Sequence, residues 1–267
     1  MPYRLTSYKL RQIQKKRQKR RRIFALIAFI IVIGGLGWVL FFSSVFQIKS
    51  IAITPTRFVS INDIFQKVQE RLNNQKLFKF ISVPANLILF GKDDCQIIKN
   101  SFAALDSVDC QKNYIAHSVK INVKEKEAVG LFCPSSLSKE YKKCLYVDQS
   151  GIVFAFVEDD FKANNSIVLI KDPTDRLYNP GDRIISGEFS LVLKIKDILA
   201  SHHLQLESIE IDDRDINYFS ENGFKLFVSQ EKLKETVSVL PQLIKTDFDL
   251  QKLEYLDLRF LPKVYYK

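Results

Sequence analysis

Few residues in this sequence combine the types and the spacing that catalysis or metal binding requires. The three histidines, His117, His202 and His203, lie in no H-E-x-x-H motif and in no other metal-binding spacing. The adjacent pair follows an apolar helical pattern, so a helix C-terminal cap explains it better than a zinc site. The chain has no G-x-S-x-G motif, no P-loop and no G-x-G-x-x-G motif, and its G-G-L-G run lies inside a long apolar segment.

The densest acidic cluster consists of Asp212, Asp213 and Asp215. Such a cluster could act as a pair of glycosidase carboxylates or bind a cation. It stands between two strand-like runs, however, where the sequence IDDRD is typical of a solvated turn. A serine–lysine hydrolase is compatible with the composition, but no serine has a recognisable nucleophile setting. The sequence therefore predicts no enzyme activity, no cofactor, no metal and no small-molecule substrate.

The four cysteines, Cys95, Cys110, Cys133 and Cys144, all lie beyond the long apolar segment. A zinc site is one interpretation, but the spacings contain no C-x-x-C pair. Disulfides in an oxidising compartment suit the distribution better. Four cysteines allow three pairings, among which sequence alone does not choose. We favour the sequential bridges Cys95 to Cys110 and Cys133 to Cys144, because the second pair flanks a loop between two strand-like runs.

Charge and hydropathy set the N-terminus apart from the rest of the chain. Residues 1–22 contain ten lysines and arginines and no acid, and the remaining chain has 30 basic and 30 acidic residues. A neutral remainder argues against nucleic-acid binding. Residues 23–42 carry no charge, and at about 1.5 Å per helical residue they can cross the roughly 30 Å core of a bilayer. A cleaved signal peptide, the alternative, would have a shorter apolar region ending in small residues.

The charges on the two sides of the apolar segment predict its orientation. Ten basic residues precede it, whereas the 20 residues after it contain only Lys49 and Arg57. By the positive-inside rule the N-terminus is cytoplasmic and the chain from residue 43 onward is extracytoplasmic. We therefore predict a single-pass protein of the cell membrane, with a basic tail (1–22) that lies on anionic lipid and a transmembrane helix (23–42).

The exported part is long enough for two modest domains. Its first half predicts a strand, two helices and two strands, in that order. Ser60 suits the N-cap of the first helix, in which apolar residues recur at helical spacing from Ile61 to Leu72. Its second half is rich in strands, with hairpin turns at 148–151 and 221–223, and it contains two further helices. The sequence predicts an α+β ectodomain, with a β-α-α-β-β domain at 46–126 and a mainly antiparallel β domain with flanking helices at 127–267. The expected strands are 46–53, 119–123, 129–133, 144–147, 152–157, 166–170, 206–211, 216–219, 224–228 and 253–260, and the expected helices are 60–72, 93–105, 191–199 and 231–243.

The last expected strand alternates strictly. Leu256, Leu258 and Phe260 should face the core, which leaves Tyr255, Asp257 and Arg259 on the opposite face. An open sheet edge can accept a partner strand, and aromatic residues and arginine most often carry interface energy. The alternative is an edge that the protein itself covers. We predict a partner-binding site formed by Tyr255, Asp257, Arg259, Val264, Tyr265 and Tyr266.

The order of these segments resembles that of the FtsQ/DivIB family of bacterial cell-division proteins. Residues 46–68, FQIKSIAITPTRFVSINDIFQKV, look like the opening of a polypeptide-transport-associated (POTRA) domain. Residues 119–132, VKINVKEKEAVGLF, are similar to the family's paired strands around a Glu-Arg-x-Pro-Val-Ala run. In this run the chain keeps Glu125 and Val129, while Lys126, Ala128 and Gly130 replace the usual Arg, Pro and Ala.

Two later segments extend the resemblance. CLYVDQSGIVFAF, at 144–156, resembles the family's aspartate-x-x-glycine hairpin at Asp148 and Gly151. LEYLDLRF, at 253–260, is similar to the family's closing V-D-L-R-like motif. Two features depart from the family: Thr54-Pro55 replaces a glycine in the first turn, and the four cysteines are not general among its members.

The resemblance implies a non-enzymatic scaffold of the division septum. Such a scaffold binds the small coiled-coil membrane proteins FtsB (DivIC) and FtsL and couples divisome assembly to septal cell-wall synthesis. A membrane-anchored extracytoplasmic enzyme, such as a cell-wall hydrolase, is an alternative. A POTRA-type transport or assembly factor is another.

Overall fold

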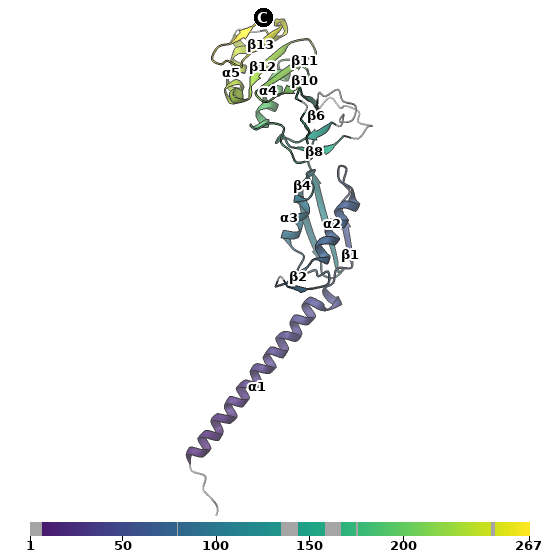
Figure 1. Ribbon diagram of the computed structural model, residues 1–267, viewed down its shortest axis with the longest axis vertical. Coiled ribbons are helices and arrows are strands. Elements are labelled where there is room, and N and C mark those ends of the chain that lie inside the picture. The colour runs from purple at the N-terminus through teal and green to yellow at the C-terminus, as the bar shows by residue number, and fades with distance from the viewer. Residues whose placement is uncertain (1–6, 79, 135–143, 158–166, 175, 247–248) are drawn as a thin grey trace, which may run out of the picture. The chain divides into compact units, whose positions relative to one another are not determined.

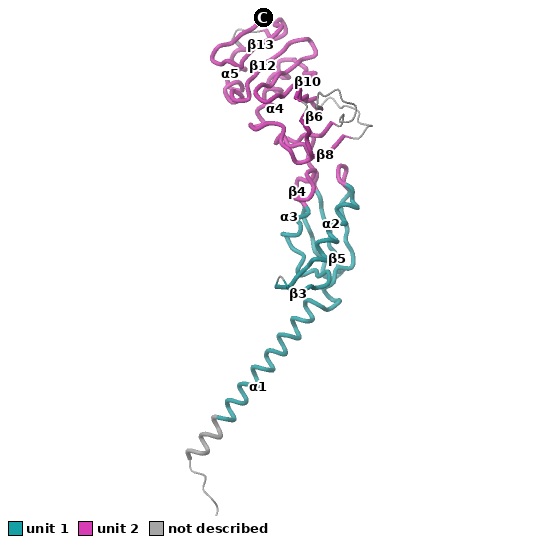
Figure 2. Tube along the Cα trace, viewed as in Figure 1, with its two compact units in different colours: residues 1–55, 60–98, 108–123 teal, residues 56–59, 99–107, 124–267 magenta. Residues whose placement is uncertain are grey.

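The computed structural model describes residues 7–78, 80–134, 144–157, 167–174, 176–246 and 249–267 (Figure 1). The chain forms two compact units (Figure 2). Unit 1 comprises residues 1–55, 60–98 and 108–123, and unit 2 comprises residues 56–59, 99–107 and 124–267. The fold is α+β, with an apolar N-terminal helix and a large mixed sheet.

Helix α1 (Ser7–Phe42) opens unit 1 and contains the predicted transmembrane segment. Its part from Lys16 to Phe42 is long and apolar enough to cross a membrane, and none of its most apolar stretch is buried in the protein. A membrane anchor and an N-terminal signal sequence both have these properties. The helix ends just before the 3-10 turn Ser44–Phe46, which leads the chain to the first strand of unit 1.

The rest of unit 1 contains a three-stranded sheet in the order β1-β5-β4, with β1 parallel to β5. The two helices α2 and α3 lie beside this sheet (Figure 1). Buried Ile64, Val68 and Leu72 recur every four residues and give α2 one apolar stripe. The elements are β1 (Ser50–Ile53), α2 (Ile61–Asn73), β2 (Lys76–Leu77), β3 (Ile81–Ser82), α3 (Lys92–Asn100), β4 (Leu105–Asn113) and β5 (Ser118–Glu125).

Polar side chains fix the starts of both helices. The Ser60 hydroxyl accepts a hydrogen bond from the N–H of Asn62 at 3.2 Å, which confirms the predicted N-terminal cap of α2. The Asp94 carboxylate accepts from the N–H of Gly91 at 2.9 Å and holds the turn that leads into α3. It also pairs with Arg71 of α2 at 2.9 Å, so one carboxylate joins the two helices.

The strands of this region differ from the prediction in two places. The long strand β4 was not predicted, and the second helix ends at Asn100 rather than at residue 105. Four of the nine residues of β4 are Asp, Gln or Lys, and most of its side chains are exposed, so it lacks the apolar alternation that marks a half-buried strand. The expected strand at 129–133 exists, but it lies in the large sheet of unit 2.

Unit 2 is built around a nine-stranded sheet in the order β14-β13-β12-β11-β10-β9-β6-β7-β8. Helices α4 (Phe189–Ser201) and α5 (Leu233–Thr246) bury apolar side chains in the core of this unit. The strands are β6 (Gly130–Pro134), β7 (Leu145–Val147), β8 (Val153–Phe156), β9 (Val168–Asp172), β10 (Leu206–Ile211), β11 (Asp215–Ser220), β12 (Lys225–Ser229), β13 (Tyr255–Asp257) and β14 (Tyr265–Tyr266).

The sheet is mixed, whereas a mainly antiparallel one was predicted. Strand β9 runs parallel to both β6 and β10, and β12 runs parallel to β13. The chain passes through α4 between β9 and β10, and through α5 between β12 and β13. A helix between two strands allows the crossover that parallel neighbours require. The predicted hairpins β7–β8 and β11–β12 are confirmed as antiparallel pairs.

Two glycines of the family-like segments occupy places where a side chain would clash. Gly151 has a φ of +75°, and a Cβ there would lie 2.8 Å from the Cβ of Phe189. A Cβ on Gly130 would lie 2.7 Å from Cδ1 of Ile170 on the neighbouring strand. The first explains the glycine of the β7–β8 turn by backbone conformation and packing together. At position 130 the close atom is the far end of the Ile170 side chain, and the carbonyl oxygen of Val168 lies 3.3 Å away, so an added Cβ would require Ile170 to shift.

Both predicted disulfides are present. Cys95 of α3 bonds Cys110 of β4, with Cα atoms 6.3 Å apart. Cys133 and Cys144 form the second bridge, with Cα atoms 4.4 Å apart, beside the antiparallel pair β6–β7. Residues 135–143 of the loop that this bridge closes lie outside the described residues.

We expect each bridge to stabilise the fold, because it removes freedom from the unfolded chain. Closing loops of 15 and 11 residues corresponds to about 3 kcal/mol each in the chain-entropy model. Replacing Cys95 and Cys110 together by serine should therefore lower the free energy of unfolding by about 3 kcal/mol in a urea titration of the oxidised protein. The parent protein should show no titratable thiol under native conditions, and reactive thiols there would contradict the pairing.

Candidate partner-binding surface

Strand β14 forms one edge of the nine-stranded sheet. It pairs antiparallel with β13, with Tyr266 opposite Leu256 and Tyr265 opposite Asp257. The N–H of Lys267 donates to the carbonyl of Tyr255 at 3.2 Å, which continues the ladder to the next residue. Within the part of the chain that the structure describes, no strand follows β14 in the sheet, so its outer side is a sheet edge. Such an edge is a template for a further strand.

The register shows which side chains share the outer face of the sheet at this edge. Leu256 is buried on the core side, and opposite residues in a ladder point to the same face. Tyr255 and Asp257 therefore point to the other side, together with Tyr265. Phe227 lies opposite Asp257 on the neighbouring strand β12 and joins this face.

Three residues of this face form, together with Arg259 and Phe260 of the following turn, what we call the edge cluster: Phe227, Tyr255, Arg259, Phe260 and Tyr265. The ring centroids of Phe227 and Tyr255 are 6.2 Å apart, and those of Phe260 and Tyr265 are 6.0 Å apart. The guanidinium carbon of Arg259 lies 5.2 Å from the centroid of Phe227 and 5.5 Å from that of Phe260. These distances suit cation–π contacts, so the arginine joins the two aromatic pairs.

Two carboxylates hold this arginine in place. Asp257 accepts from Arg259 Nη2 at 2.6 Å and from Nε at 3.0 Å, and Asp215 accepts from Nη1 at 3.2 Å. Burial alone would raise the pKa of Asp257, but the hydrogen bonds from the Arg259 side chain and N–H lower it below its ordinary value. The hydrogen bonds with Asp257 likewise raise the pKa of Arg259. The guanidinium is therefore charged and oriented before any partner arrives.

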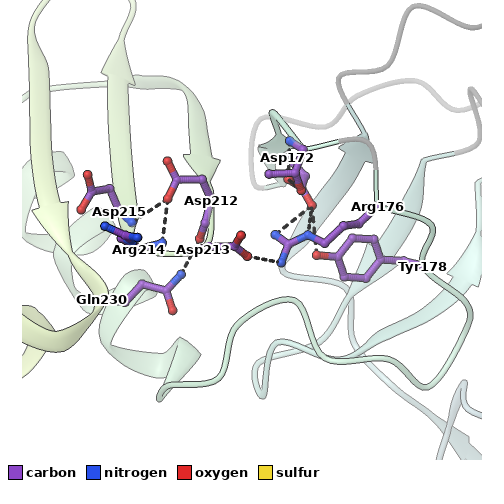
Figure 3. Close-up of polar contacts among 9 residues, drawn as sticks. Asp172, Arg176, Tyr178, Asp212, Asp213, Arg214, Asp215 and Gln230 are labelled. Atoms are coloured by element: carbon purple, nitrogen blue, oxygen red, sulfur yellow. Dashed lines mark hydrogen bonds and ion pairs between the residues drawn. The ribbon is translucent and has the colours of Figure 1, made fainter.

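The turn between β10 and β11 positions Asp215 (Figure 3). The Asp212 carboxylate accepts from the N–H groups of Arg214 and Asp215 at 2.8 and 2.7 Å. Gln230 donates to the carbonyl of Asp212 at 2.6 Å and fixes the turn from the other side. The acidic cluster is a turn, as predicted. Each of its carboxylates has a different partner: Asp212 binds the N–H groups of the turn, Asp215 binds Arg259, and Asp213 binds Arg176.

The third of these carboxylates, Asp213, connects the turn to a buried polar network. It accepts from Arg176 at 2.5 Å, and Arg176 also pairs with Asp172 (Figure 3). Asp172 is fully buried and accepts from Thr174 and from the Tyr178 hydroxyl at 3.0 Å. Burial, followed by the hydrogen bond to Asp172, raises the pKa of Tyr178 to about 12. Tyr178 therefore stays a proton donor, and this network ties the loop after β9 to the β10–β11 turn.

The predicted site residues do not all lie on the surface. Tyr265 and Tyr266 are exposed, Tyr255 and Arg259 are half-buried, and Val264 packs partly against the core. Asp257 is buried and contacts Arg259. The site includes Phe227 and Phe260, which were not predicted to belong to it. The aromatic types and the alternation at 224–228 were the only signals for Phe227.

The prediction that Phe260 faces the core is wrong. Strand β13 ends at Asp257, and the chain then turns, so the alternation does not continue. Phe260 is 58% exposed, and Leu261 is buried in the core instead. The hydrogen bonds that Asp257 accepts from the N–H and the side chain of Arg259 stabilise this turn.

The family-like residues elsewhere in unit 2 are structural. The Glu125 carboxylate accepts from the N–H groups of Arg57, Phe58 and Val59 at 2.7 to 3.2 Å. Lys126 and Asp148 form a largely buried ion pair at 2.7 Å. These contacts fasten a loop and a hairpin to the end of β5.

Comparison with known proteins adds no assignment. No family model matches the chain, and no curated protein matches it. The histidine pair behaves as predicted, because His202 is the C-terminal cap of α4. No group of three or more potential metal ligands is found among the described residues.

The ion pair predicts an acid-dependent contribution to stability. A lowered pKa of Asp257 stabilises the fold above the unfolded value of about 3.9, and this stabilisation is lost as the pH falls through the lower folded value. The substitution Asp257→Asn should lower the free energy of unfolding by about 1 to 3 kcal/mol at pH 7, and the difference from the parent should shrink below about pH 4.

Asp249→Asn is the matched control for this experiment. Asp249 pairs with Lys252 at 3.1 Å, but both side chains are exposed. An exposed pair contributes little, so this variant should remain close to the parent in urea titrations at both pH values. A difference for Asp257→Asn that is the same at pH 3 and pH 7 would contradict the role of the charge.

Proposed function

We propose that the chain is a non-enzymatic scaffold of the bacterial division septum, held in the cell membrane by α1. It binds small bitopic coiled-coil proteins of the FtsB/DivIC and FtsL type and couples divisome assembly to septal cell-wall synthesis. The observation that carries the proposal is the sheet edge at β14 with its edge cluster. The resemblance of the sequence to the FtsQ/DivIB family supports it independently.

The edge offers the two components of strand addition. Main-chain groups of an edge strand provide affinity for any extended segment, and side chains around it provide specificity. Here the side chains are aromatic rings and an arginine that Asp257 and Asp215 already orient. Because the arginine is ordered before binding, the binding free energy is not reduced by the entropy cost of ordering this side chain.

The order of elements in unit 1 supports a POTRA assignment. Apart from the two-residue strands β2 and β3, the order is strand, helix, helix, strand, strand. The three longer strands form one sheet, and the two helices accompany it. We therefore assign unit 1 from β1 onward as a POTRA domain of the exported part.

The enzymatic alternative has less support. A pocket is lined by the carboxylates of Asp106, Glu125, Glu127 and Asp148, but lysines share it. Asp148 pairs with Lys126 at 2.7 Å, Asp106 with Lys124 at 3.5 Å, and Glu125 is bonded to three N–H groups. A general acid or base needs a proton that it can exchange with a substrate, and three of the four carboxylates are bonded to the protein itself.

The substitution Tyr265→Pro should abolish capture of the partner's exported segment. Tyr255 and Lys267 exchange main-chain hydrogen bonds, so by alternation the N–H of Tyr265 also points toward β13. Proline lacks that N–H and detaches β14. Tyr265→Ala should weaken binding by about 1 to 3 kcal/mol. Pull-down with the exported segments of FtsB-type and FtsL-type proteins measures both effects.

Tyr114→Ala is the matched control for capture. Tyr114 is 54% exposed and Tyr265 is 49% exposed, but Tyr114 lies in unit 1. Its truncation should leave capture unchanged. Undiminished capture by a Tyr265→Pro protein whose circular dichroism is native would place the docking site elsewhere.

Topology can be tested in intact spheroplasts. Protease added to spheroplasts should remove the part of the chain after α1 and leave the basic tail, because the excess positive charge keeps the tail in the cytoplasm. Antibodies against each end distinguish the fragments. A C-terminus that resists the protease until the membrane is permeabilised would contradict the proposed orientation.

A further inference from the structure

Where the sheet of unit 1 meets the end of α1, two separate hairpins expose apolar side chains. The β2–β3 hairpin carries Phe78 and Phe80, which are 74% and 75% exposed, followed by the partly exposed Ile81. The turn between β4 and β5 carries Tyr114 and Ile115, and Ile115 is 94% exposed. Large apolar side chains that gather on one surface in water indicate a contact with another apolar phase.

Hydrogen bonds place the first hairpin beside the end of α1. Asn86, which is fully buried, donates to the carbonyls of Leu40 and Phe41 at 3.0 and 3.2 Å, in the last turn of α1. The N–H of Asn86 donates to the Gln75 side chain at 2.6 Å. Gln75 directly precedes β2, so both ends of the hairpin are tied to the point where α1 ends.

The second hairpin is bonded to the same point. The N–H of Lys49, three residues after the 3-10 turn that follows α1, donates to the carbonyl of His117 at 2.8 Å. Ser50 and Ser118 then begin the parallel pairing of β1 with β5. The turn at residues 114–117 therefore lies at the α1 end of the sheet rather than at its other end.

We propose that the tips of these two hairpins insert into the headgroup region of the bilayer beside α1. This inference rests on the part of the proposed function that makes α1 a membrane anchor. Lipid is the occupant because the tips adjoin the end of an apolar helix whose own last turns carry the stacked aromatics Trp38 and Phe42. Aromatic rings are enriched at this depth of membrane proteins. The exposed Lys49 and Lys76 add positive charge that favours anionic headgroups.

With α1 and the two hairpin tips all in the bilayer, unit 1 has three attachments instead of one, which would fix its orientation. A single helix leaves a domain free to rotate and tilt about the point where the helix ends. Two hairpin tips, bonded to that point on separate strands, oppose tilting when both lie in lipid. Unit 1 then presents a constant face to the periplasm or cell-wall space.

Tryptophan fluorescence of the full chain in phosphatidylcholine–phosphatidylglycerol vesicles tests the insertion. The sequence has a single tryptophan, Trp38, so Trp38→Phe gives a silent background. Phe80→Trp and Ile115→Trp then report on each hairpin. Lipids brominated near the headgroup should quench both reporters several-fold more than lipids brominated near the end of the acyl chain, with emission shifted to the blue.

Ile61→Trp is the matched control. Ile61 is exposed and apolar, but it opens α2, whose other end joins Gln75. At 1.5 Å per residue, the 13 residues of α2 place it about 18 Å from the hairpin end of the unit. Its reporter should show no bromolipid quenching. Phe78→Ser together with Phe80→Trp should lose part of the quenching, with circular dichroism to confirm that the fold is retained.

Alkaline carbonate extraction separates the two hypotheses. A chain that stays in the bilayer while the reporters at 80 and 115 match the Ile61→Trp control overturns hairpin insertion and leaves the anchor standing. A chain that carbonate releases overturns both. A retained chain with quenched reporters supports the insertion, whatever the partner capture by β14 shows.

Discussion

The arrangement of the C-terminal edge depends on one buried carboxylate, that of Asp257. A carboxylate that is 7% exposed at the end of a strand needs a cation, and Arg259, two residues later, supplies it. To bring the guanidinium back to Asp257, the chain must leave the strand immediately after it. That turn directs Phe260 outward, places Leu261 in the core, and returns the chain antiparallel to β13 as β14. The edge and its exposed aromatics thus follow from the ion pair.

Elements with a local physical signal could be predicted from the sequence. The Ser60 cap and the four-residue apolar repeat identified α2, and Gly151 and Gly223, both with positive φ, marked two hairpins. Elements that depend on distant partners could not. Strand β4 exposes most of its side chains, so its own sequence carries no alternation. The parallel pairs β9–β10 and β12–β13 depend on helices that lie between the strands, which local patterns do not specify.

The candidate site was predictable only by residue type. Tyr255, Arg259 and Tyr265 were assigned because aromatic residues and arginine stood on an alternating C-terminal strand. Phe227 joins them only through the register of β12 with β13, a contact between residues far apart in the sequence. Asp215 also comes from elsewhere in the chain, on a turn that looked merely solvated. Periodicity assigned Phe260 to the core because it cannot detect a strand that stops after three residues.

The edge is also built to avoid pairing with its own copies. Strand β14 has two residues, and Pro262, Lys263 and Lys267 lie on either side of it. Short edges flanked by proline and lysine discourage indiscriminate strand addition. A partner strand gains few main-chain bonds along so short an edge, so the edge cluster must supply much of the binding energy. Selectivity then comes from a partner that offers both a strand and side chains that pack against the aromatic rings on either side of Arg259.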